Sequence, residues 1–425
     1  MLYDELKERG LVYQETSEKL PEILENPMTF YCGFDPTADS LHIGSLLPLI
    51  TMRRLQLHGH KPIMVLGGAT GMIGDPSGKS KERVLLTPEI IEKNAEGIRK
   101  NAERVIDFSG DNPAILKNNL EWMGPYSYVN FLRDVGKHFS INYMLGKDSV
   151  KSRIENRDQG ISYTEFSYML LQSYDFCYLN KENNCILQLG ASDQWGNITA
   201  GVELLRRMKG DDQNKDTAYG FTFPLVTKAD GSKFGKSEGG NIWLNPEKTS
   251  PYQFYQFFLR LPDDEVLKLL RFFSLKPLDE IKALEERFKE APHKREAQLS
   301  LAEELTTMIH GEDEFKRVAH ASQVLFSGGI DELDEKTLRE VFSEAPSVNI
   351  SKSELSEKTL VDVLVEAKLC NSKGAARKDI KAGAVYLNNN RFEGEDLPGK
   401  ELPLLFDSLL VLRRGKKNYC LAQFS

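Results

Sequence analysis

Short apolar runs alternate with helical patterns in the first half of the chain. Residues 29–34, 62–66 and 185–189 are compact apolar runs followed by turn-forming residues, as expected for buried strands. Apolar residues recur at near-helical intervals over 41–59, and residues 89–106 also have the pattern of a helix. Strands that alternate with helices predict a mostly parallel α/β sheet that binds ligands at the carboxyl ends of its strands.

A different pattern follows beyond residue 250. Residues 251–325 are rich in Leu, Glu, Lys and Phe at helical intervals, which predicts a helical domain. The polar stretch 341–358 lacks apolar periodicity and is expected to be a linker. After it, residues 359–388 predict two helices and then a short strand, AVYLN.

Composition limits the class of protein. The apolar runs fall well short of the ~18 residues that a membrane-spanning helix needs, so no membrane contact is expected. The first residues mix both charges without the apolar core of a signal peptide, and the five cysteines show no metal-binding spacing. These features favour a cytoplasmic protein with reduced thiols and no metal site of its own.

Charge is distributed unevenly along the chain. The whole chain carries a net charge of −8, of which residues 351–425 contribute +3 and the residues before them −11. A mildly basic end on an acidic body is a first indication that this end binds a polyanion.

Two segments have the composition of phosphate-binding loops. In residues 31–45 a strand and a turn lead to a helix start, where free backbone N–H groups favour an anion and His42 adds a donor. In KADGSKFGKSEGG, Lys233 and Lys236 lie in a glycine-rich loop that can surround a phosphate chain. The simpler interpretations are a structural histidine and a solvated surface loop. GDPSGKS (74–80) has one residue too few between its glycines for a Walker loop and is interpreted as a strand-to-helix turn.

Together these segments resemble the paired motifs of class I aminoacyl-tRNA synthetases. The first motif stands here as HIGS (42–45) and the second as KFGKS (233–237). The stretches YCGFDPTADSLHIG, GATGMIGDPSGK, YMLLQSYD and SDQWGN narrow the resemblance to tyrosyl-tRNA synthetases of the bacterial type. The similarity covers essentially the whole chain.

The resemblance implies an α/β fold: a Rossmann-like class I synthetase catalytic domain, then a helical anticodon-binding domain and a small α+β RNA-binding module. The expected parts are a catalytic domain over 1–227 with an inserted helical segment near 110–150, a mobile KFGKS loop and connector over 228–248, the anticodon-binding domain over 249–335, a linker over 336–356 and the RNA-binding module over 357–425. The resemblance also implies a homodimer with its interface in the catalytic domain. The run FLRDVGKHFSINYML is a candidate for that interface and could equally be core.

The implied reaction has two steps. L-Tyrosine and ATP give tyrosyl-adenylate and pyrophosphate, and the tyrosyl group then passes to the 3′-terminal adenosine of tRNA(Tyr). A carboxylate that attacks the α-phosphate needs no protein nucleophile, so the protein supplies positioning and charge stabilisation. ATP implies Mg²⁺, for which the sequence shows no dedicated cage of protein ligands.

The resemblance further implies which residues bind tyrosine. Tyr31 and Asp175 are expected to hydrogen-bond the substrate phenol, and Asp75 to hold its ammonium group together with Tyr168 and Gln172. Tyr168, Gln172 and Asp175 are spaced so that a helix would place them on one face. The set expected at tyrosine is Tyr31, Asp35, Asp75, Tyr168, Gln172, Asp175 and Gln194.

The nucleotide is expected to contact both motifs and their flanks. The expected ATP-binding set is Cys32, Gly33, His42, Gly44, Asp193, Lys233, Lys236 and Ser237. The set expected to act in catalysis is Thr37, His42, Ser45, Lys79, Arg83, Lys233 and Lys236. The chain departs from the family motifs at two places. Ser45 stands where a histidine is most common, and Phe234 and Gly235 stand where many class I enzymes have Met and Ser.

The C-terminal module is expected to bind tRNA through basic side chains. Lys373, Arg377 and Lys381 recur at helical intervals and form a stripe that faces either phosphates or solvent. The expected tRNA contacts are Lys368, Lys373, Arg377, Lys378 and Lys381.

Three other functions stay open at the level of sequence. A non-catalytic RNA-binding protein on a decayed synthetase scaffold would have lost residues such as His42 and Asp75, which are present. Tryptophanyl-tRNA synthetase shares the architecture, but Tyr31 and Asp175 suit a phenol and the basic C-terminal module speaks against it. A small-molecule adenylating ligase of the same type would not need the residues expected to bind RNA.

Overall fold

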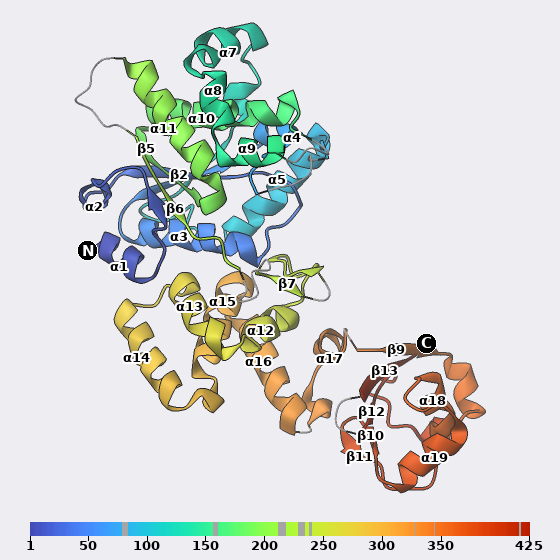
Figure 1. Cartoon of the computed structure of the whole chain (residues 1–425). Helices are drawn as coiled ribbons and strands as arrows, with labels where there is room; N and C mark the ends of the chain where they lie inside the picture. The colour runs from blue at the N-terminus through green and yellow to red at the C-terminus, as the bar shows by residue number, and fades with distance from the viewer. Residues whose placement is uncertain are drawn as a thin grey trace. The chain divides into compact units, whose positions relative to one another are not determined.

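A six-stranded sheet forms the centre of the N-terminal half of the chain (Figure 1). Its strand order is β1-β6-β5-β2-β3-β4, and every pair is parallel except β1 with β6. The strands are β1 (Gln14–Glu15), β2 (Thr29–Phe34), β3 (Lys61–Leu66), β4 (Ile115–Asn118), β5 (Cys185–Ala191) and β6 (Tyr219–Phe223). The predictions of a mostly parallel sheet and of strands at β2, β3 and β5 are confirmed.

The structure, a computed structural model, describes nine ranges of the chain: 1–78, 84–155, 160–210, 218–227, 234–237, 240–327, 329–343, 345–415 and 418–425. These residues group into two units, one formed by 1–249 and 258–309 and the other by 250–257 and 310–425. Among the described helices, none combines the length and the apolar character needed to cross a bilayer.

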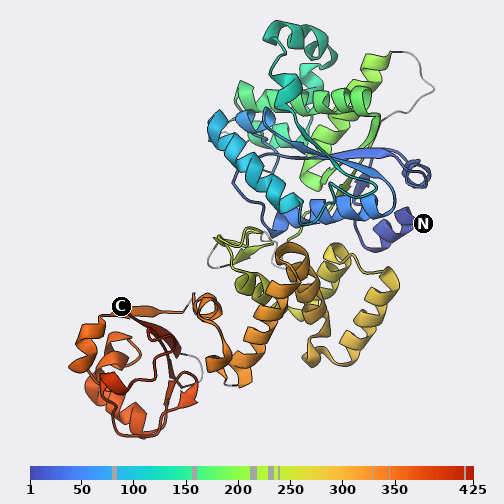
Figure 2. The ribbon, with the colours of Figure 1, turned by 180° about the vertical axis from the view of Figure 1, so that it is seen from behind.

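Helices cover both faces of the six-stranded sheet. α10 (Tyr163–Asn183) and α11 (Trp195–Lys209) lie on one face and α3 (Leu46–Leu57) on the other, as Figure 2 shows from behind. Ser162 begins α10 by accepting the Glu165 N–H, and Asn184 ends it in the left-handed conformation. The other described helices of this part are α1 (Leu2–Glu8), α2 (Leu20–Ile23), α4 (Thr70–Ile73), α5 (Pro88–Ala102), α6 (Leu120–Met123), α7 (Tyr128–Asp134), α8 (Ile141–Leu145) and α9 (Asp148–Glu155).

A buried ion pair fixes the start of α10. Arg153 on α9 donates to both carboxylate oxygens of Glu165, at 3.1 and 2.8 Å, and the two side chains are 2% and 1% exposed. Breaking such a pair on one side would leave an uncompensated charge in the interior. The pair therefore holds the first turn of α10, one turn before Tyr168.

The strand order reverses between β2 and β5. The chain continues from β2 to β3 on one side and returns through β5 on the other. The segments that leave the carboxyl ends of these two strands therefore diverge, and open parallel sheets bind ligands in the crevice at such a point.

Helices fill the segment 249–335, as predicted, but they do not form one unit. They are α12 (Pro251–Leu259), α13 (Asp263–Phe273), α14 (Leu278–Glu290), α15 (Glu296–His310) and α16 (Glu312–Ser327), and α17 (Glu335–Val341) begins at the last residue of the segment. The unit that contains the six-stranded sheet includes α13, α14 and nearly all of α15, whereas α16 and α17 belong to the second unit.

The C-terminal part contains a second sheet with the order β11-β10-β12-β13-β9. Its strands are β9 (Ser347–Ile350), β10 (Val385–Leu387), β11 (Asn390–Arg391), β12 (Leu409–Arg414) and β13 (Asn418–Phe424). The helices α18 (Leu360–Glu366) and α19 (Lys373–Lys381) share one hydrophobic core with this sheet. The predicted strand in AVYLN is confirmed as β10.

Two boundaries taken from the sequence are wrong in detail. The expected linker 336–356 contains β9, which pairs in parallel with β13 near the end of the chain. The helical insertion near 110–150 begins after β4, which pairs with β3 as part of the main sheet. Both strands have four residues and depend on partners that are distant in sequence, so local periodicity does not reveal them.

Candidate active site

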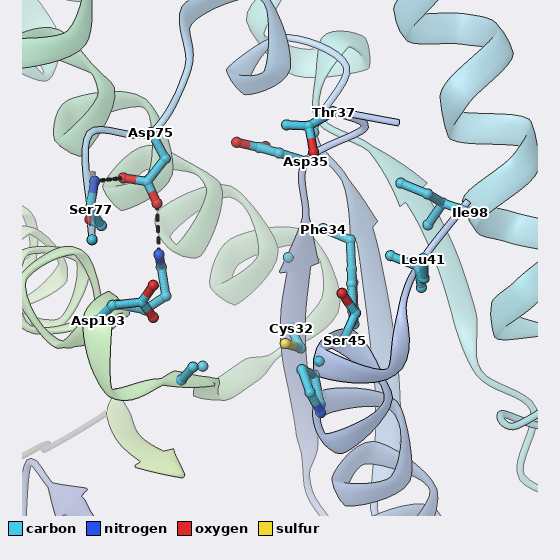
Figure 3. Close-up of a pocket in the computed structure, with 18 of the residues that line it drawn as sticks. Cys32, Phe34, Asp35, Thr37, Leu41, Ser45, Asp75, Ser77, Ile98 and Asp193 are labelled. Atoms are coloured by element: carbon cyan, nitrogen blue, oxygen red, sulfur yellow. Dashed lines mark hydrogen bonds between the residues drawn. The ribbon is translucent and has the colours of Figure 1, made fainter. Parts of the chain in front are cut away.

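A cavity of about 760 Å³ lies at the carboxyl ends of β2 and β5, where the segments that follow these two strands diverge (Figure 3). Its walls come from the ends of these strands, the segment that leads into α3, and one face of α10. Figure 3 shows Cys32 and Ser45 on one flank and Asp75 and Asp193 on the opposite one. The expected site residues that line the cavity are Tyr31, Cys32, Gly33, Asp35, Thr37, His42, Gly44, Ser45, Asp75, Tyr168, Gln172, Asp175, Asp193 and Gln194.

The remaining expected residues of the catalytic part belong to two further segments of the chain. Lys79, Arg83 and Lys233 lie outside the described residues. Lys236 and Ser237 form the short strand β7 (Lys236–Ser237), which pairs with β8 (Gly240–Asn241). The structure therefore describes the backbone of the second motif from Phe234 onward.

One end of the cavity holds a buried carboxylate with two fixed donors. Asp175 is 4% exposed. Its Oδ1 accepts from Trp122 Nε1 at 2.8 Å and its Oδ2 from Asn119 Nδ2 at 3.1 Å. Burial raises the pKa of Asp175 to about 7, although both donors act in the opposite direction by stabilising the charged form. The carboxylate is therefore oriented, and it titrates near neutral pH.

Tyr31 lies beside this carboxylate with an unused hydroxyl. The side chain is 1% exposed, and its hydroxyl has no hydrogen-bond partner among the residues that the structure describes. Burial, together with the charge of Asp175, raises the pKa of Tyr31 well above its ordinary value, so the group stays a phenol that can donate. An unpaired buried hydroxyl costs about 1–3 kcal/mol. A ligand hydroxyl that accepts from Tyr31 and donates to Asp175 would satisfy both groups.

The opposite flank carries a second carboxylate among amide groups. Asp75 Oδ1 accepts from the Ser77 N–H at 2.9 Å, and Oδ2 accepts from Gln194 Nε2 at 2.7 Å. The carbonyl of Gln194 in turn accepts from Gln172 Nε2 at 3.3 Å and from Asn197 Nδ2 at 3.2 Å. A fixed carboxylate lined by polar groups suits a ligand ammonium.

Asp35 lines the cavity, and its carboxylate accepts hydrogen bonds from two side chains of the wall. Its Oδ2 accepts from the Tyr168 hydroxyl at 2.8 Å and its Oδ1 from Thr70 Oγ1 at 2.7 Å. A Cβ on Gly67 would lie 2.0 Å from the same Oδ1, so the turn between β3 and α4 requires glycine there. Asp35 thus orients Tyr168 at the cavity wall, and Gly67 permits the close packing of this carboxylate.

The first motif forms a tight turn that directs the imidazole of His42. The residues Ile43–Ser45 form a 3₁₀ turn directly before α3, and His42 Nδ1 accepts the Gly44 N–H at 3.0 Å. In the neutral imidazole the proton is therefore assigned to Nε2, which makes that nitrogen the donor. A Cβ on Gly44 would lie 2.7 Å from His42 Cε1, so glycine is needed for this ring position.

The thiol of Cys32 contributes volume rather than charge. Cys32 is 3% exposed, and burial raises its pKa to about 12. It therefore stays protonated at neutral pH and forms an apolar part of the wall.

Several residues that complete the site were missed in the sequence. Asn119 and Trp122 directly follow β4, and Asn119 is fully buried. Polar residues at the carboxyl end of a parallel strand are a signal for a ligand site, but it is usable only once the strand is recognised. Asn119 and Trp122 were missed for this reason. Thr70, Ser77 and Asn197 follow the predicted strands β3 and β5 and were missed although those strands were recognised.

The basic residues expected at tRNA lie together in the C-terminal module. Lys373 to Lys381 is α19, preceded by Lys368, and all five expected side chains are exposed. Lys373 also forms an ion pair with Asp362 at 2.6 Å, so part of its charge is already compensated.

Known proteins match the chain over nearly its full length. Residues 24–327 match the family described as tRNA synthetases class I (W and Y), and residues 337–422 match the tyrosine–tRNA ligase SYY-like C-terminal domain. The chain is 50% identical over 425 residues to the tyrosine–tRNA ligases of two strains of Staphylococcus epidermidis, covering 100% of this chain and 99% of those proteins.

Solved structures agree with the sequence matches. A C-terminally truncated mitochondrial tyrosyl-tRNA synthetase from Aspergillus nidulans is 32% identical with a TM-score of 0.69, over 76% of this chain and 94% of that one. A tryptophanyl-tRNA synthetase from Plasmodium falciparum, 15% identical with a TM-score of 0.51 over 80% of this chain and 87% of that one, shares the fold. The chain therefore belongs to the tyrosine–tRNA ligase family of class I tRNA synthetases.

Proposed function

We propose that this chain activates L-tyrosine with ATP to tyrosyl-adenylate and pyrophosphate, and then transfers tyrosine to the 3′-terminal adenosine of tRNA(Tyr). The observation that carries the proposal is the unpaired Tyr31 hydroxyl beside the oriented carboxylate of Asp175. In this arrangement the phenol of the substrate tyrosine bridges Tyr31 and Asp175. The ammonium group of the substrate then points toward Asp75, Tyr168 and Gln172. The carboxylate of the substrate is directed at the nucleotide part of the cavity.

The ATP part of the cavity is built around the first motif. The His42 Nε2 donor and the exposed Thr37 hydroxyl face the pyrophosphate, while Cys32 and Gly33 form the wall beside the ribose together with Asp193. In this proposal Ser45 gives a shorter neutral contact than the histidine common in the family. Lys79, Arg83, Lys233 and Lys236 are proposed to stabilise the charge that develops on the leaving pyrophosphate, with Ser237 beside them.

The nucleotide enters as its Mg²⁺ complex, with the phosphates as the main ligands of the ion. Among the described residues, no group of three or more His, Cys, Asp or Glu side chains is arranged to hold a metal ion. We further propose the cytoplasm as the site of action. All five cysteines lie in described ranges and are free, which suits a reducing compartment.

Tryptophan is the nearest alternative substrate, because its ligases share this fold. An indole N–H donates but does not accept, so tryptophan would satisfy Asp175 and leave the Tyr31 hydroxyl unpaired. Phenylalanine would leave both groups unpaired. The pocket therefore selects for a group that donates and accepts at once.

Amino-acid-dependent ATP–pyrophosphate exchange without tRNA tests the proposed substrate. Exchange is expected with tyrosine and not with tryptophan or phenylalanine at equal concentration. Exchange with tryptophan would overturn the assignment of Tyr31 and Asp175. Folded protein that is silent with all three would favour either a tRNA-dependent enzyme or the decayed scaffold.

The pKa of Asp175 predicts an acid limb in the pH profile. Tyrosine binding uses the carboxylate, so kcat/KM for tyrosine is expected to rise as the pH increases through about 7. Trp122→Phe removes a donor that stabilises the charged form, so the pKa of Asp175 rises and the limb moves to higher pH. The ring stack on Tyr178, at 4.4 Å between centroids, is kept. An unshifted limb in the variant would contradict this role, and KM for ATP across the same pH range serves as the control.

The exposed face of α19 is proposed to bind tRNA phosphates. Arg377→Glu with Lys381→Glu is expected to raise KM for tRNA about tenfold or more and to reduce the salt dependence of binding, while pyrophosphate exchange is unchanged. Lys400→Glu, an exposed substitution outside α19, is the matched control. Equal aminoacylation by the double variant and the control would exclude α19 from the tRNA interface.

An exposed apolar surface supports the proposed homodimer. It is formed by α7, α8 and the start of α10, where Val129 is 73% exposed and Tyr128 63%. Its members are Tyr128, Val129, Leu132, Ile141, Leu145 and Tyr163, and the hydroxyls of Tyr128 and Tyr163 lie 3.1 Å apart. Exposed apolar surface that exceeds scattered single residues is typical of interfaces. The run FLRDVGKHFSINYML was interpreted either as a dimer interface or as core. An interface accounts for its exposed residues, whereas Phe131 and Phe139 pack against the core.

Val129→Glu tests this surface by placing a charge in the proposed interface. Sedimentation velocity is expected to show a shift from dimer to monomer in the variant. Val84→Glu, at a position 86% exposed elsewhere in the chain, should remain dimeric. A wild-type protein that sediments as a monomer would refute the homodimer, and a dimeric Val129→Glu protein would move the interface away from α7.

A further inference from the structure

Three consecutive residues at the carboxyl end of α13, Phe272, Phe273 and Ser274, contact three separate parts of the N-terminal region. All three are buried, with at most 3% of any of them exposed. The Phe272 ring lies against Gly10, where an added Cβ would come within 3.3 Å of the ring. This close approach fixes the end of α13 against the turn that follows α1.

Ser274 is the attachment point of two buried arginines. Its carbonyl accepts from Arg54 Nη2 at 2.6 Å and from Arg9 Nη1 at 3.1 Å. Arg9 also donates to the carbonyls of Arg271 and Lys276, at 3.2 and 2.6 Å. Both arginines are 2% exposed, and both also face Glu5, whose Oε1 lies 2.7 Å from Arg9 Nε and 3.8 Å from Arg54 Nε. Losing the carbonyl acceptors would leave buried guanidinium N–H groups unsatisfied. The carbonyls at the end of a helix also carry the negative end of its dipole, which favours the cations.

Arg54 connects this turn to the first motif. It lies on α3, the helix that begins directly after the His42–Ser45 segment. Most of α3 is buried, and a packed helix transmits a displacement of one end to the other. A shift of Ser274 therefore moves the segment that carries His42.

Phe234 connects the same turn to the second motif. Its ring is 2% exposed and stacks on Phe273, with centroids 5.9 Å apart and an interplanar angle of 23°. Gly235, at φ +85°, lies against Ile43, where an added Cβ would come within 2.5 Å of the side chain. Two backbone hydrogen bonds continue this contact: Ile242 N–H donates to the Gly235 carbonyl at 2.9 Å, and Ile43 N–H to the Ile242 carbonyl at 3.0 Å.

We propose that the Phe272–Ser274 end of α13 is a positioning element for the ATP half of the reaction, which rests on the proposed assignment of both motifs to ATP. It holds the first motif through Arg54 and the second through Phe234, so both motifs keep one relative position at the phosphates. The tyrosine end of the cavity is built on β2, α10 and the residues after β4, so the element acts on ATP and not on tyrosine.

Stopped-flow measurement of adenylate formation by the full-length protein tests this coupling. Phe234→Leu and Phe273→Leu are each expected to lower the rate constant divided by the ATP dissociation constant about fivefold to tenfold. The dissociation constant of tyrosine should stay within about twofold of the wild type. Because both rings act through one contact, the double variant should be no worse than the more severe single variant. Phe234→Met can still contact the Phe273 ring through its thioether sulfur, which Leu cannot, and should retain most of the rate.

Arg54→Met tests the other connection in the same assay. The variant removes the donor to the Ser274 carbonyl. We therefore expect the same decrease in the rate constant divided by the ATP dissociation constant, and an unchanged dissociation constant for tyrosine. A parallel loss of tyrosine affinity would mean that Arg54 maintains the fold instead of positioning the motif.

Phe288→Leu is the matched control, because Phe288 is a buried ring on α14 with 5% exposure. It should lower the thermal midpoint as much as Phe273→Leu does, without changing adenylate formation. The proposal is overturned if Phe288→Leu causes the same kinetic loss, if the single effects multiply in the double variant, or if the Phe234 and Phe273 variants react like wild type. Wild-type activity with tyrosine is measured first, so an inactive wild type contradicts the proposed function instead.

Discussion

The ionised carboxylate of Asp175 has to be kept available inside a buried pocket, and much of the surrounding structure serves this constraint. Burial alone favours the neutral acid, whereas Asn119 and Trp122 favour the charged form and fix the direction of its lone pairs. Tyr31 adds a buried hydroxyl without a partner among the described residues, and we propose that the ligand supplies one. The pair is thus preorganised for a phenol, because the protein has already met the cost of burying both groups before the ligand arrives.

The sheet explains how these groups meet. Tyr31 is on β2, Asn119 follows β4 and Asp175 is on α10, so residues from distant parts of the chain meet where the strand order reverses. The same reversal leaves room on the other side of β2 for the first motif and α3. Tyrosine and ATP can therefore occupy adjacent halves of one cavity, while α13 supports the ATP half from outside. Because the cavity has two halves, one set of side chains is proposed to contact the amino acid and another set the nucleotide.

The sequence was sufficient to predict those elements that have a local hydrophobic or charge pattern. The strands β2, β3 and β5 and the basic helix α19 follow from local patterns. Tyr168, Gln172 and Asp175 were named through the resemblance, and their spacing fits the face of α10 on which they lie. The short strands β4 and β9 do not follow from local patterns, because each is defined by pairing with a distant strand. The roles of Asn119 and Trp122 depend on β4, and the contact between Phe234 and Phe273 joins segments that are far apart in sequence. Asp35 was expected at the ligand through the resemblance; it lines the cavity, but its contacts with Thr70 and Tyr168 join segments distant in sequence and could not be read from the sequence.

Proton exchange on tyrosine binding tests the central claim most directly. With a pKa of about 7, Asp175 is about half protonated in the free protein at pH 7. A phenol that donates to the carboxylate lowers this pKa, so binding should release roughly half a proton at pH 7 and less at pH 8. Calorimetric titration in buffers of different ionisation enthalpy measures this number. Binding of tyrosine without proton release at pH 7, or with proton uptake, would contradict the account of Asp175 as the acceptor of the substrate phenol.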